Sequence, residues 1–214
     1  MRLSRPSKKS AWNRGRIIGQ KRPLALSDIR KLEASLPQRE RWHDLALLGV
    51  ALDTMLRATD LLALQVKDVQ AATGVIKPRL VQAQRKTGNV VQPVLTPTTR
   101  QYLANWLNKS GKQPGHYLFT RTKPMGAAPI PRPHYAELVK SWAEWLGYDP
   151  ADFSTHSLRR TKAAHMYWAG EDITLVSRLL GHKSLTHTVE YLGINQHQAE
   201  QAALRHEFLT GYTG

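Results

Sequence analysis

The stretch from residue 155 to residue 191 reads THSLRRTKAAHMYWAGEDITLVSRLLGHKSLTHTVEY, and it determines how the C-terminal half folds. Glycines divide it into three segments with helical spacing of apolar residues. We expect helices from Ser157 to Ala169, from Ile173 to Leu180 and from Leu185 to Leu192. Each is followed at once by a glycine, the residue that most readily ends a helix. A last helix is expected from about Gln196 to Leu209.

The N-terminal half predicts further helices. Ser27 is the expected N-cap of the first helix. The second is expected from about Arg39 to Met55, and a short one from Thr59 to Leu64. Prolines favour the first turn of a helix, so two more are expected, from Pro97 to about Asn108 and from Pro133 to about Leu146.

Between these helices the chain is rich in valine and is interrupted by glycine and proline. Leu64–Val69, Val75–Gln84 and Asn89–Leu95 are the expected strands of a small antiparallel sheet, with a tight turn at Lys86–Asn89. Residues 109–131 are expected to be mostly loop. The fold class is therefore mixed, mainly α with a small antiparallel β-sheet.

Composition limits the function classes. The chain has 214 residues, of which 41% are hydrophobic and 22% charged, as expected for one folded domain rather than a disordered chain. It has no cysteine, which excludes a disulfide framework and a thiol nucleophile. No apolar run approaches the roughly 18–20 residues that span a bilayer, and no signal peptide is visible. We expect a cytoplasmic protein without a membrane partner.

Charge is distributed unevenly along the chain. Lys and Arg total 31 against 16 Asp and Glu, which gives a net charge of +15. Residues 1–27 hold eight basic side chains and residues 69–136 hold ten, and neither stretch holds an acid. Such segregation indicates a polyanion partner, most simply nucleic acid, although a solvated basic face is the alternative. The candidate DNA contacts are Arg14, Arg16, Lys21, Arg22 and Arg85.

Several polar side chains stand where they can act on a phosphate. His156 and Arg159 share a face at a helix start, which favours an anion. His182 follows the glycine that ends a helix, so its ring can point into a cleft. Asp60 lies three residues after Arg57 and can orient its guanidinium, although a surface ion pair is the alternative.

Lys86 is in the expected hairpin turn, and Tyr191 lies near a helix end; taken alone, a solvated lysine and a core tyrosine are the alternatives. Together, the candidates resemble the tyrosine recombinase (phage integrase) family in type and order: Arg57, Lys86, His156, Arg159, His182 and Tyr191. Residues 155–161 and 179–191 are similar to the family's signature boxes. Thr54–Arg57 resembles its first box, with Met55 where the family usually has glycine.

The resemblance covers about residues 24–210 and implies the family's catalytic-domain fold, with a tail helix from about residue 195. Residues 1–23 are then a flexible basic arm. Because only some 25 residues precede the catalytic domain, the chain resembles the family's short, single-domain members. The resemblance implies a chain encoded by a bacterium or by a phage, plasmid or other mobile genetic element.

The resemblance also implies the reaction. Tyr191 would attack a DNA phosphodiester and form a covalent 3′-phosphotyrosine, which a 5′-hydroxyl then reverses, without metal or ATP. Arg57 and Arg159 would neutralise the non-bridging oxygens. His156 is the implied base. His182 would add hydrogen bonds or move a proton, Lys86 suits protonation of the leaving oxygen, and Asp60 would orient Arg57. No cofactor is implied, and the sequence has no glycine-rich phosphate loop.

The implied partner is double-stranded DNA, bound by a tetramer on synapsed DNA whose C-terminal tails dock in trans; packing of the tail in cis is the alternative. An accessory DNA-bending protein is a further partner that the resemblance allows. Whether the outcome is integration, excision, inversion or dimer resolution stays open.

Three other functions compete with this interpretation. Glu171–Tyr191 contains a helix–turn–helix, which suits a DNA-binding regulator without catalysis. A type IB topoisomerase-like enzyme would use the same chemistry without strand exchange. A structural RNA-binding protein is less favoured, because the aromatic-rich strands of an RNA recognition sheet are missing.

Overall fold

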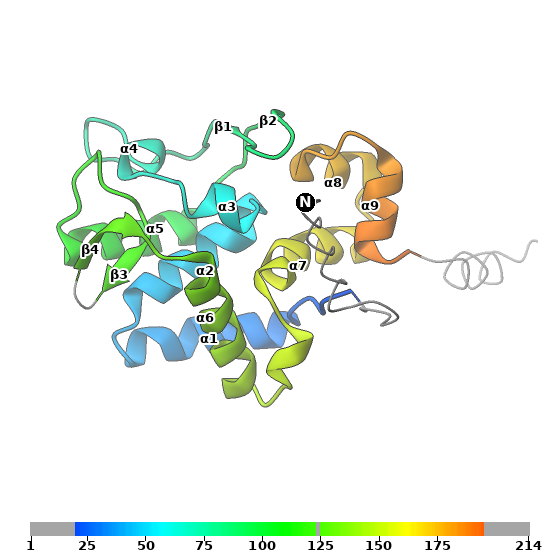
Figure 1. The fold of residues 1–214 in the computed structure, drawn as a ribbon, viewed down its shortest axis with the longest axis horizontal. Helices are drawn as coiled ribbons and strands as arrows, with labels where there is room; N and C mark the ends of the chain where they lie inside the picture. The colour runs from blue at the N-terminus through cyan, green and yellow to red at the C-terminus, as the bar shows by residue number, and fades with distance from the viewer. Residues whose placement is uncertain (1–19, 123–124, 195–214) are drawn as a thin grey trace, which may run out of the picture.

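A computed structural model describes residues 20–122 and 125–194. Over these residues the fold is mainly helical, with two short antiparallel hairpins (Figure 1). The helices are α1 (Leu26–Gln38), α2 (Trp42–Thr54), α3 (Ala58–Leu61), α4 (Val66–Val69), α5 (Pro97–Ser110), α6 (Arg132–Trp145), α7 (Thr155–Trp168), α8 (Ile173–Leu180) and α9 (Leu185–Leu192), with a 3-10 turn at Pro150–Asp152. The strands are β1 (Gln82–Ala83), β2 (Val90–Val91), β3 (Thr120–Thr122) and β4 (Met125–Pro129).

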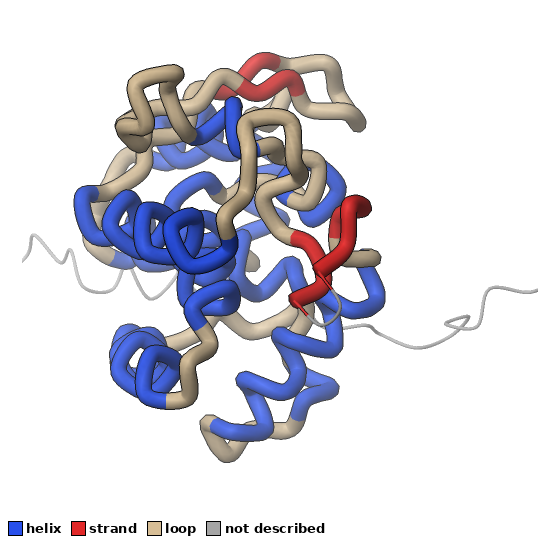
Figure 2. The backbone as a smooth tube through the Cα atoms, turned by 90° about the vertical axis from the view of Figure 1, so that its left-hand side faces the viewer, coloured by secondary structure: helices blue, strands red, loops and turns tan. Residues whose placement is uncertain are grey.

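Helix α2 is at the centre of the larger hydrophobic core. It is buried along almost its whole length, and it packs against α1, α5 and α7. A second, smaller cluster lies under α7, α8 and α9 and includes Met55, Ala163, Val176, Leu180 and Leu192. The β1–β2 hairpin projects at one end of the molecule, well separated from the β3–β4 hairpin (Figures 1 and 2). The junction between the two clusters is where α2, α7 and α8 meet.

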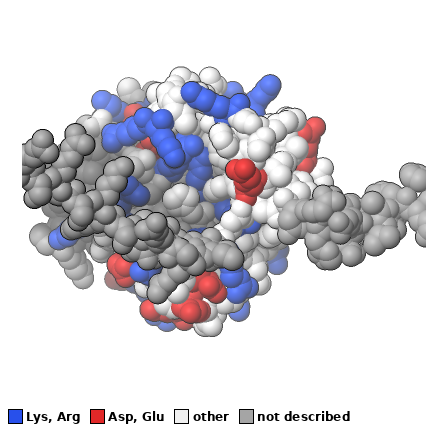
Figure 3. Space-filling view, turned by 45° about the vertical axis from the view of Figure 1, so that its right-hand side comes forward, with Lys and Arg blue, Asp and Glu red and all other residues white. Residues whose placement is uncertain are grey.

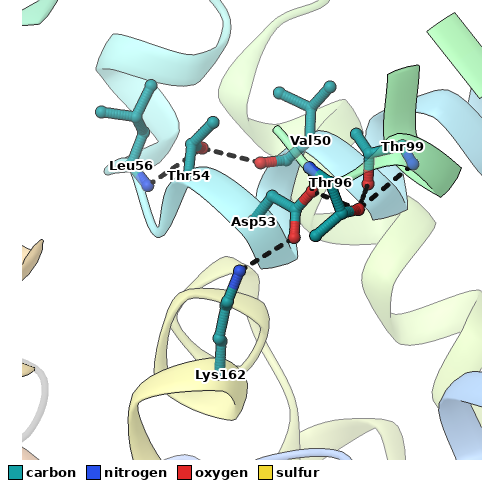
Figure 4. Close-up of polar contacts among 7 residues, drawn as sticks. All are labelled: Val50, Asp53, Thr54, Leu56, Thr96, Thr99 and Lys162. Atoms are coloured by element: carbon teal, nitrogen blue, oxygen red, sulfur yellow. Dashed lines mark hydrogen bonds and ion pairs between the residues drawn. The ribbon is translucent and has the colours of Figure 1, made fainter. Parts of the chain in front are cut away.

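A buried carboxylate ties three helices together. Asp53 near the end of α2 accepts hydrogen bonds from the Thr96 backbone N–H (2.7 Å) and hydroxyl (2.8 Å) at the start of α5. Its other oxygen pairs with Lys162 Nζ of α7 at 2.9 Å (Figure 4). A buried charge of this kind is tolerated because it is paired and hydrogen-bonded. Asp53 therefore fixes α7, which bears two candidate site residues, against the larger core.

The three helices expected between residues 155 and 192 are confirmed. Helices α8 and α9 have the predicted bounds, and both end at glycines in the left-handed conformation, Gly181 and Gly193. Helix α7 begins two residues earlier than expected, because the hydroxyl of Ser154 accepts a hydrogen bond from the His156 N–H and caps the helix.

The prediction that Ser27 is the N-cap of the first helix is wrong. The cap is Ala25, and Asp28 at the third helical position accepts the Ala25 N–H at 3.1 Å. The hydroxyl of Tyr148, which is distant in the sequence, also donates a hydrogen bond to Asp28 Oδ2 at 2.9 Å. The helix start is thus stabilised from inside its first turn, which allows it to begin earlier.

The expected three-stranded sheet is reduced to the β1–β2 hairpin. Leu64–Val69 is not a strand but contains α4, whose Asp68 carboxylate accepts the Gln65 N–H at 2.8 Å. The flanking segments pair only at isolated bridges, because Pro78 and Pro93 have no N–H to donate. Residues 109–131, expected to be mostly loop, also contain the β3–β4 hairpin.

The chain outside the described residues includes two expected features. Most of the basic arm (residues 1–19) and the tail helix at 196–209 lie there. None of the described helices is long and apolar enough to cross a membrane.

Met55 ends α2 in the left-handed conformation, with φ 48° and ψ 29°. This backbone conformation favours glycine, since any side chain adds roughly 1–2 kcal/mol of strain. In compensation, the Met55 side chain is buried in the smaller cluster. The turn also aims the Met55 carbonyl at the side chain of Arg159.

We predict that Met55→Gly is more stable than Met55→Ala by about 1 kcal/mol, the reverse of their usual order. Both variants lose the buried side chain, but only alanine retains the left-handed strain. Both should therefore be less stable than the wild type, by roughly 2–5 kcal/mol for alanine. Urea unfolding monitored by circular dichroism measures the order. An alanine variant as stable as the glycine variant would show that the turn is not strained.

Candidate active site

The site is built where the two hydrophobic clusters meet. Arg57 precedes α3, His156 and Arg159 lie in the first two turns of α7, His182 follows α8, and Tyr191 belongs to α9. Distant segments thus bring these candidates together, because α7 crosses α2 and the glycine turns fold α8 and α9 back on it.

Arg159 is the buried centre of the site, only 3% exposed. Its Nη1 donates to the carbonyl of Met55 at 2.6 Å and its Nη2 to the carbonyl of Leu180 at 2.8 Å. Both carbonyls are at helix C-termini, where the helix dipole favours a cation. Burial lowers the pKa of Arg159 to about 10, which still leaves it charged at neutral pH.

Arg57 is half-buried and is held by an unexpected partner. Its Nη1 donates to Gln84 Oε1 at 2.7 Å, whereas the expected bond to Asp60 is not formed. Asp60 is fully buried, and its Oδ1 accepts the backbone N–H of Arg85 at 3.1 Å. Its Oδ2 has no partner among the described residues. The structure therefore places Asp60 against the backbone of the hairpin turn. Its negative charge acts on Arg159, whose pKa it raises.

Lys86 is exposed in the turn of the β1–β2 hairpin, as expected. The pKa of His156 is lowered by partial burial and then by the positive charges of Arg159, Arg132, Arg57 and Lys86. Four cations thus act on one imidazole. The described part of the chain holds no group of three or more His, Cys, Asp or Glu placed to bind a metal ion.

His182 and Tyr191 pack edge to face, with ring centroids 5.4 Å apart. His182 Nδ1 lies 3.0 Å from the hydroxyl of Thr188, which orients the ring. Burial, followed by the charges of Arg159 and Arg57, lowers the pKa of His182 to about 4. The imidazole is therefore neutral at physiological pH and serves as a hydrogen-bonding group rather than as a cation.

The hydroxyl of Tyr191 is buried beside Arg159, and no described residue accepts a hydrogen bond from it. Burial raises the pKa of Tyr191 to about 12 and outweighs Arg159, Arg160 and Arg57, which lower it. At pH 7 only about one molecule in 100,000 carries the phenolate at such a pKa. Tyr191 and His156 line one cavity of about 230 Å³, together with Arg160. The resting site therefore holds a neutral phenol next to a histidine and the arginines.

The candidate DNA contacts divide into three groups. Arg14 and Arg16 lie outside the described residues. Lys21 Nζ donates a hydrogen bond to the Ala151 carbonyl, and Arg22 Nη1 lies 3.9 Å from Asp152 Oδ2. Both side chains therefore make contacts within this chain. Arg85 is exposed beside Lys86. Figure 3 shows Lys and Arg side chains gathered along the upper part of one face, at the height of the hairpin in Figure 1.

The structure adds three residues that the sequence did not single out. Gln84 binds Arg57, Arg132 contributes positive charge next to His156, and Arg160 donates to the Leu192 carbonyl at 2.8 Å. Arg160 follows Arg159 directly, a signal that is equally typical of a solvated pair. Gln84 and Arg132 carry no local signal, because their roles depend on contacts between distant segments.

Comparison with known proteins agrees with this arrangement. The Phage integrase family matches residues 24–198. Tyrosine recombinase XerC of Herpetosiphon aurantiacus is 28% identical over 186 residues, which are 84% of this chain and 58% of that protein. The chain thus spans about three fifths of that relative's length.

Solved structures share the fold. The crystal structure of XerA recombinase has a TM-score of 0.68 at 17% identity, covering 88% of this chain and 66% of that chain. The Tn1549 transposon integrase in complex with a circular intermediate DNA has a TM-score of 0.65 at 18% identity, covering 88% of this chain and 67% of that chain. Since the family match extends over most of the sequence and the fold agrees, the chain belongs to the Phage integrase family.

Proposed function

We propose that the chain is a site-specific DNA recombinase that cleaves and rejoins DNA strands through a covalent 3′-phosphotyrosine intermediate. One observation carries the proposal: the buried hydroxyl of Tyr191 lies within the field of Arg57 and Arg159, with no anion among the described residues paired to it. A phosphodiester supplies the anion that such a group of cations accommodates. The Tn1549 transposon integrase, which is similar in fold, is bound to DNA, and this supports DNA as the partner class.

The two arginines overcome the repulsion that protects a phosphodiester. A guanidinium has five N–H groups, and Arg159 uses two of its nitrogens on carbonyls, which leaves further N–H groups for a phosphate. Because Arg159 is fixed from behind, it binds the transition state without reorganising. Arg57 is held in the same way by Gln84.

Tyr191 needs help to become a nucleophile, since its pKa is about 12 at rest. His156 is the proposed base, because it shares a cavity with Tyr191 and its lowered pKa keeps the imidazole neutral and able to accept a proton. Neutral His182 would donate a hydrogen bond to the phosphate through Nε2 while Thr188 holds Nδ1. Lys86, exposed in its turn, would protonate the leaving 5′-oxygen.

The wider assembly follows from the same proposal. Double-stranded DNA is the partner, bound by a tetramer whose tails dock in trans, with an accessory DNA-bending protein as a further candidate. Because the substrate is DNA, the proposed place of action is the bacterial cytoplasm.

We predict that Tyr191→Phe abolishes covalent attachment to DNA while binding persists, because only one hydroxyl is lost. The substrate is DNA carrying the recombination site with a nick beside the cleavage position, which traps the adduct. A denaturing gel should show an adduct for the wild type and none for the variant. Adduct at the wild-type level in the variant would show that Tyr191 is not the nucleophile. If the chain is a non-catalytic regulator, neither the wild type nor the variant will form an adduct.

We predict that Lys86→Ala slows cleavage of normal DNA strongly but cleaves DNA with a 5′-bridging phosphorothiolate at nearly the wild-type rate. Sulfur leaves without a proton, so a missing acid no longer matters, and a loss of roughly 10²–10⁴-fold should be rescued. Arg159→Ala is the control, since phosphate charge is present in both substrates and rescue is not expected. Equal defects of the lysine variant on both substrates would make Lys86 a phosphate anchor.

A further inference from the structure

Gln84 uses every polar atom of its side chain on the candidate active site. It is 2% exposed and follows β1, just before the turn that bears Lys86. Its Oε1 accepts hydrogen bonds from Arg57 Nη1 at 2.7 Å and from the hydroxyl of Thr87 at 2.9 Å. Its Nε2 donates to the carbonyl of Leu180 at 3.0 Å. The amide thus contacts three separate segments at once.

The carbonyl of Leu180 is shared, because Arg159 Nη2 donates to it at 2.8 Å. A continuous chain of hydrogen bonds therefore runs from Arg57 through the Gln84 amide and the Leu180 carbonyl to Arg159. This chain links the two guanidiniums through the Gln84 amide.

The backbone of Gln84 holds the hairpin turn as well. Its carbonyl accepts the N–H groups of Gly88 at 2.8 Å and Thr87 at 3.3 Å, and Asn89 Nδ2 donates to the carbonyl of Gly181 at 3.2 Å. The approach to α8 is close enough that a Cβ at Gly181 would lie 2.6 Å from Gln84 Nε2. The glycine that ends α8 thus also makes room for this contact.

We propose that Gln84 is a positioning residue that holds Arg57 in place relative to Arg159 around the scissile phosphate. This role rests on the recombinase function proposed above. Only an amide satisfies the site: its oxygen faces two donors and its nitrogen faces a carbonyl. A carboxylate of the same shape would place a negative oxygen against the Leu180 carbonyl and offset the charge of Arg57.

The test compares Gln84→Met, which keeps the shape but makes none of these hydrogen bonds, with Gln92→Met as a matched change at an exposed glutamine of the same hairpin. Single-turnover cleavage of the nicked substrate is measured at saturating DNA. Gln84→Met should cleave about 10–10²-fold more slowly, the loss that a misplacement of about 1 Å produces, with DNA affinity unchanged. Gln92→Met should cleave like the wild type.

Two further measurements separate positioning from general damage to the fold. In an Arg57→Ala background, Gln84→Met should slow cleavage by no more than about twofold, because the residue through which it acts is gone. On a substrate with an uncharged methylphosphonate at the scissile position, the defect of Gln84→Met should shrink at least about tenfold, since less phosphate charge must be offset.

The outcomes distinguish this inference from the function on which it rests. If the wild type forms no adduct, the recombinase function fails and the role of Gln84 fails with it. If the wild type cleaves but Gln84→Met cleaves equally fast, multiplies the defect of Arg57→Ala, or is equally slow on both substrates, only the positioning role is overturned.

Discussion

A guanidinium buried between two helix C-termini holds the whole site together. Arg159 reaches from α7 to the last carbonyls around α2 and α8, and so joins the large core to the smaller cluster. A buried cation is costly unless it is fully hydrogen-bonded, which makes this junction specific in its geometry. The left-handed turn at Met55, the glycine at 181 and the Asp53–Lys162 pair all serve to bring the two carbonyls to one side chain.

The charges of the candidate site are mostly positive, and an anionic substrate would balance them. The positive charges of Arg57, Arg132, Lys86 and Arg159 act on His156. Among the described residues of the site, Asp60 supplies a single buried carboxylate, which acts on Arg159. Burial keeps the phenol of Tyr191 and the imidazole of His182 neutral. A phosphate entering this field would balance the cations and lie close to the phenol. In the proposed mechanism, the substrate therefore completes the charge arrangement that the protein leaves open.

The parts of the fold with local signals could be predicted from the sequence. Helices α8 and α9 were predicted to the residue because Gly181 and Gly193 end them. The candidate site residues were proposed from the types of side chain and their order along the chain. The sheet was overpredicted, since Pro78 and Pro93 remove ladder donors in a valine-rich segment. Gln84 and the buried position of Asp60 were missed, because only tertiary contacts between residues tens of positions apart create them.

The identity of the protein–DNA bond is the sharpest check on the proposed chemistry. The covalent adduct formed on nicked substrate is digested with nuclease and trypsin, and the linked peptide is sequenced by mass spectrometry. Tryptic residues 184–205 contain Tyr191 as their one tyrosine. We expect a nucleotide joined through its 3′-phosphate to Tyr191. A bond to another residue, a 5′-phosphate linkage, or tight DNA binding with no adduct would contradict the proposed mechanism.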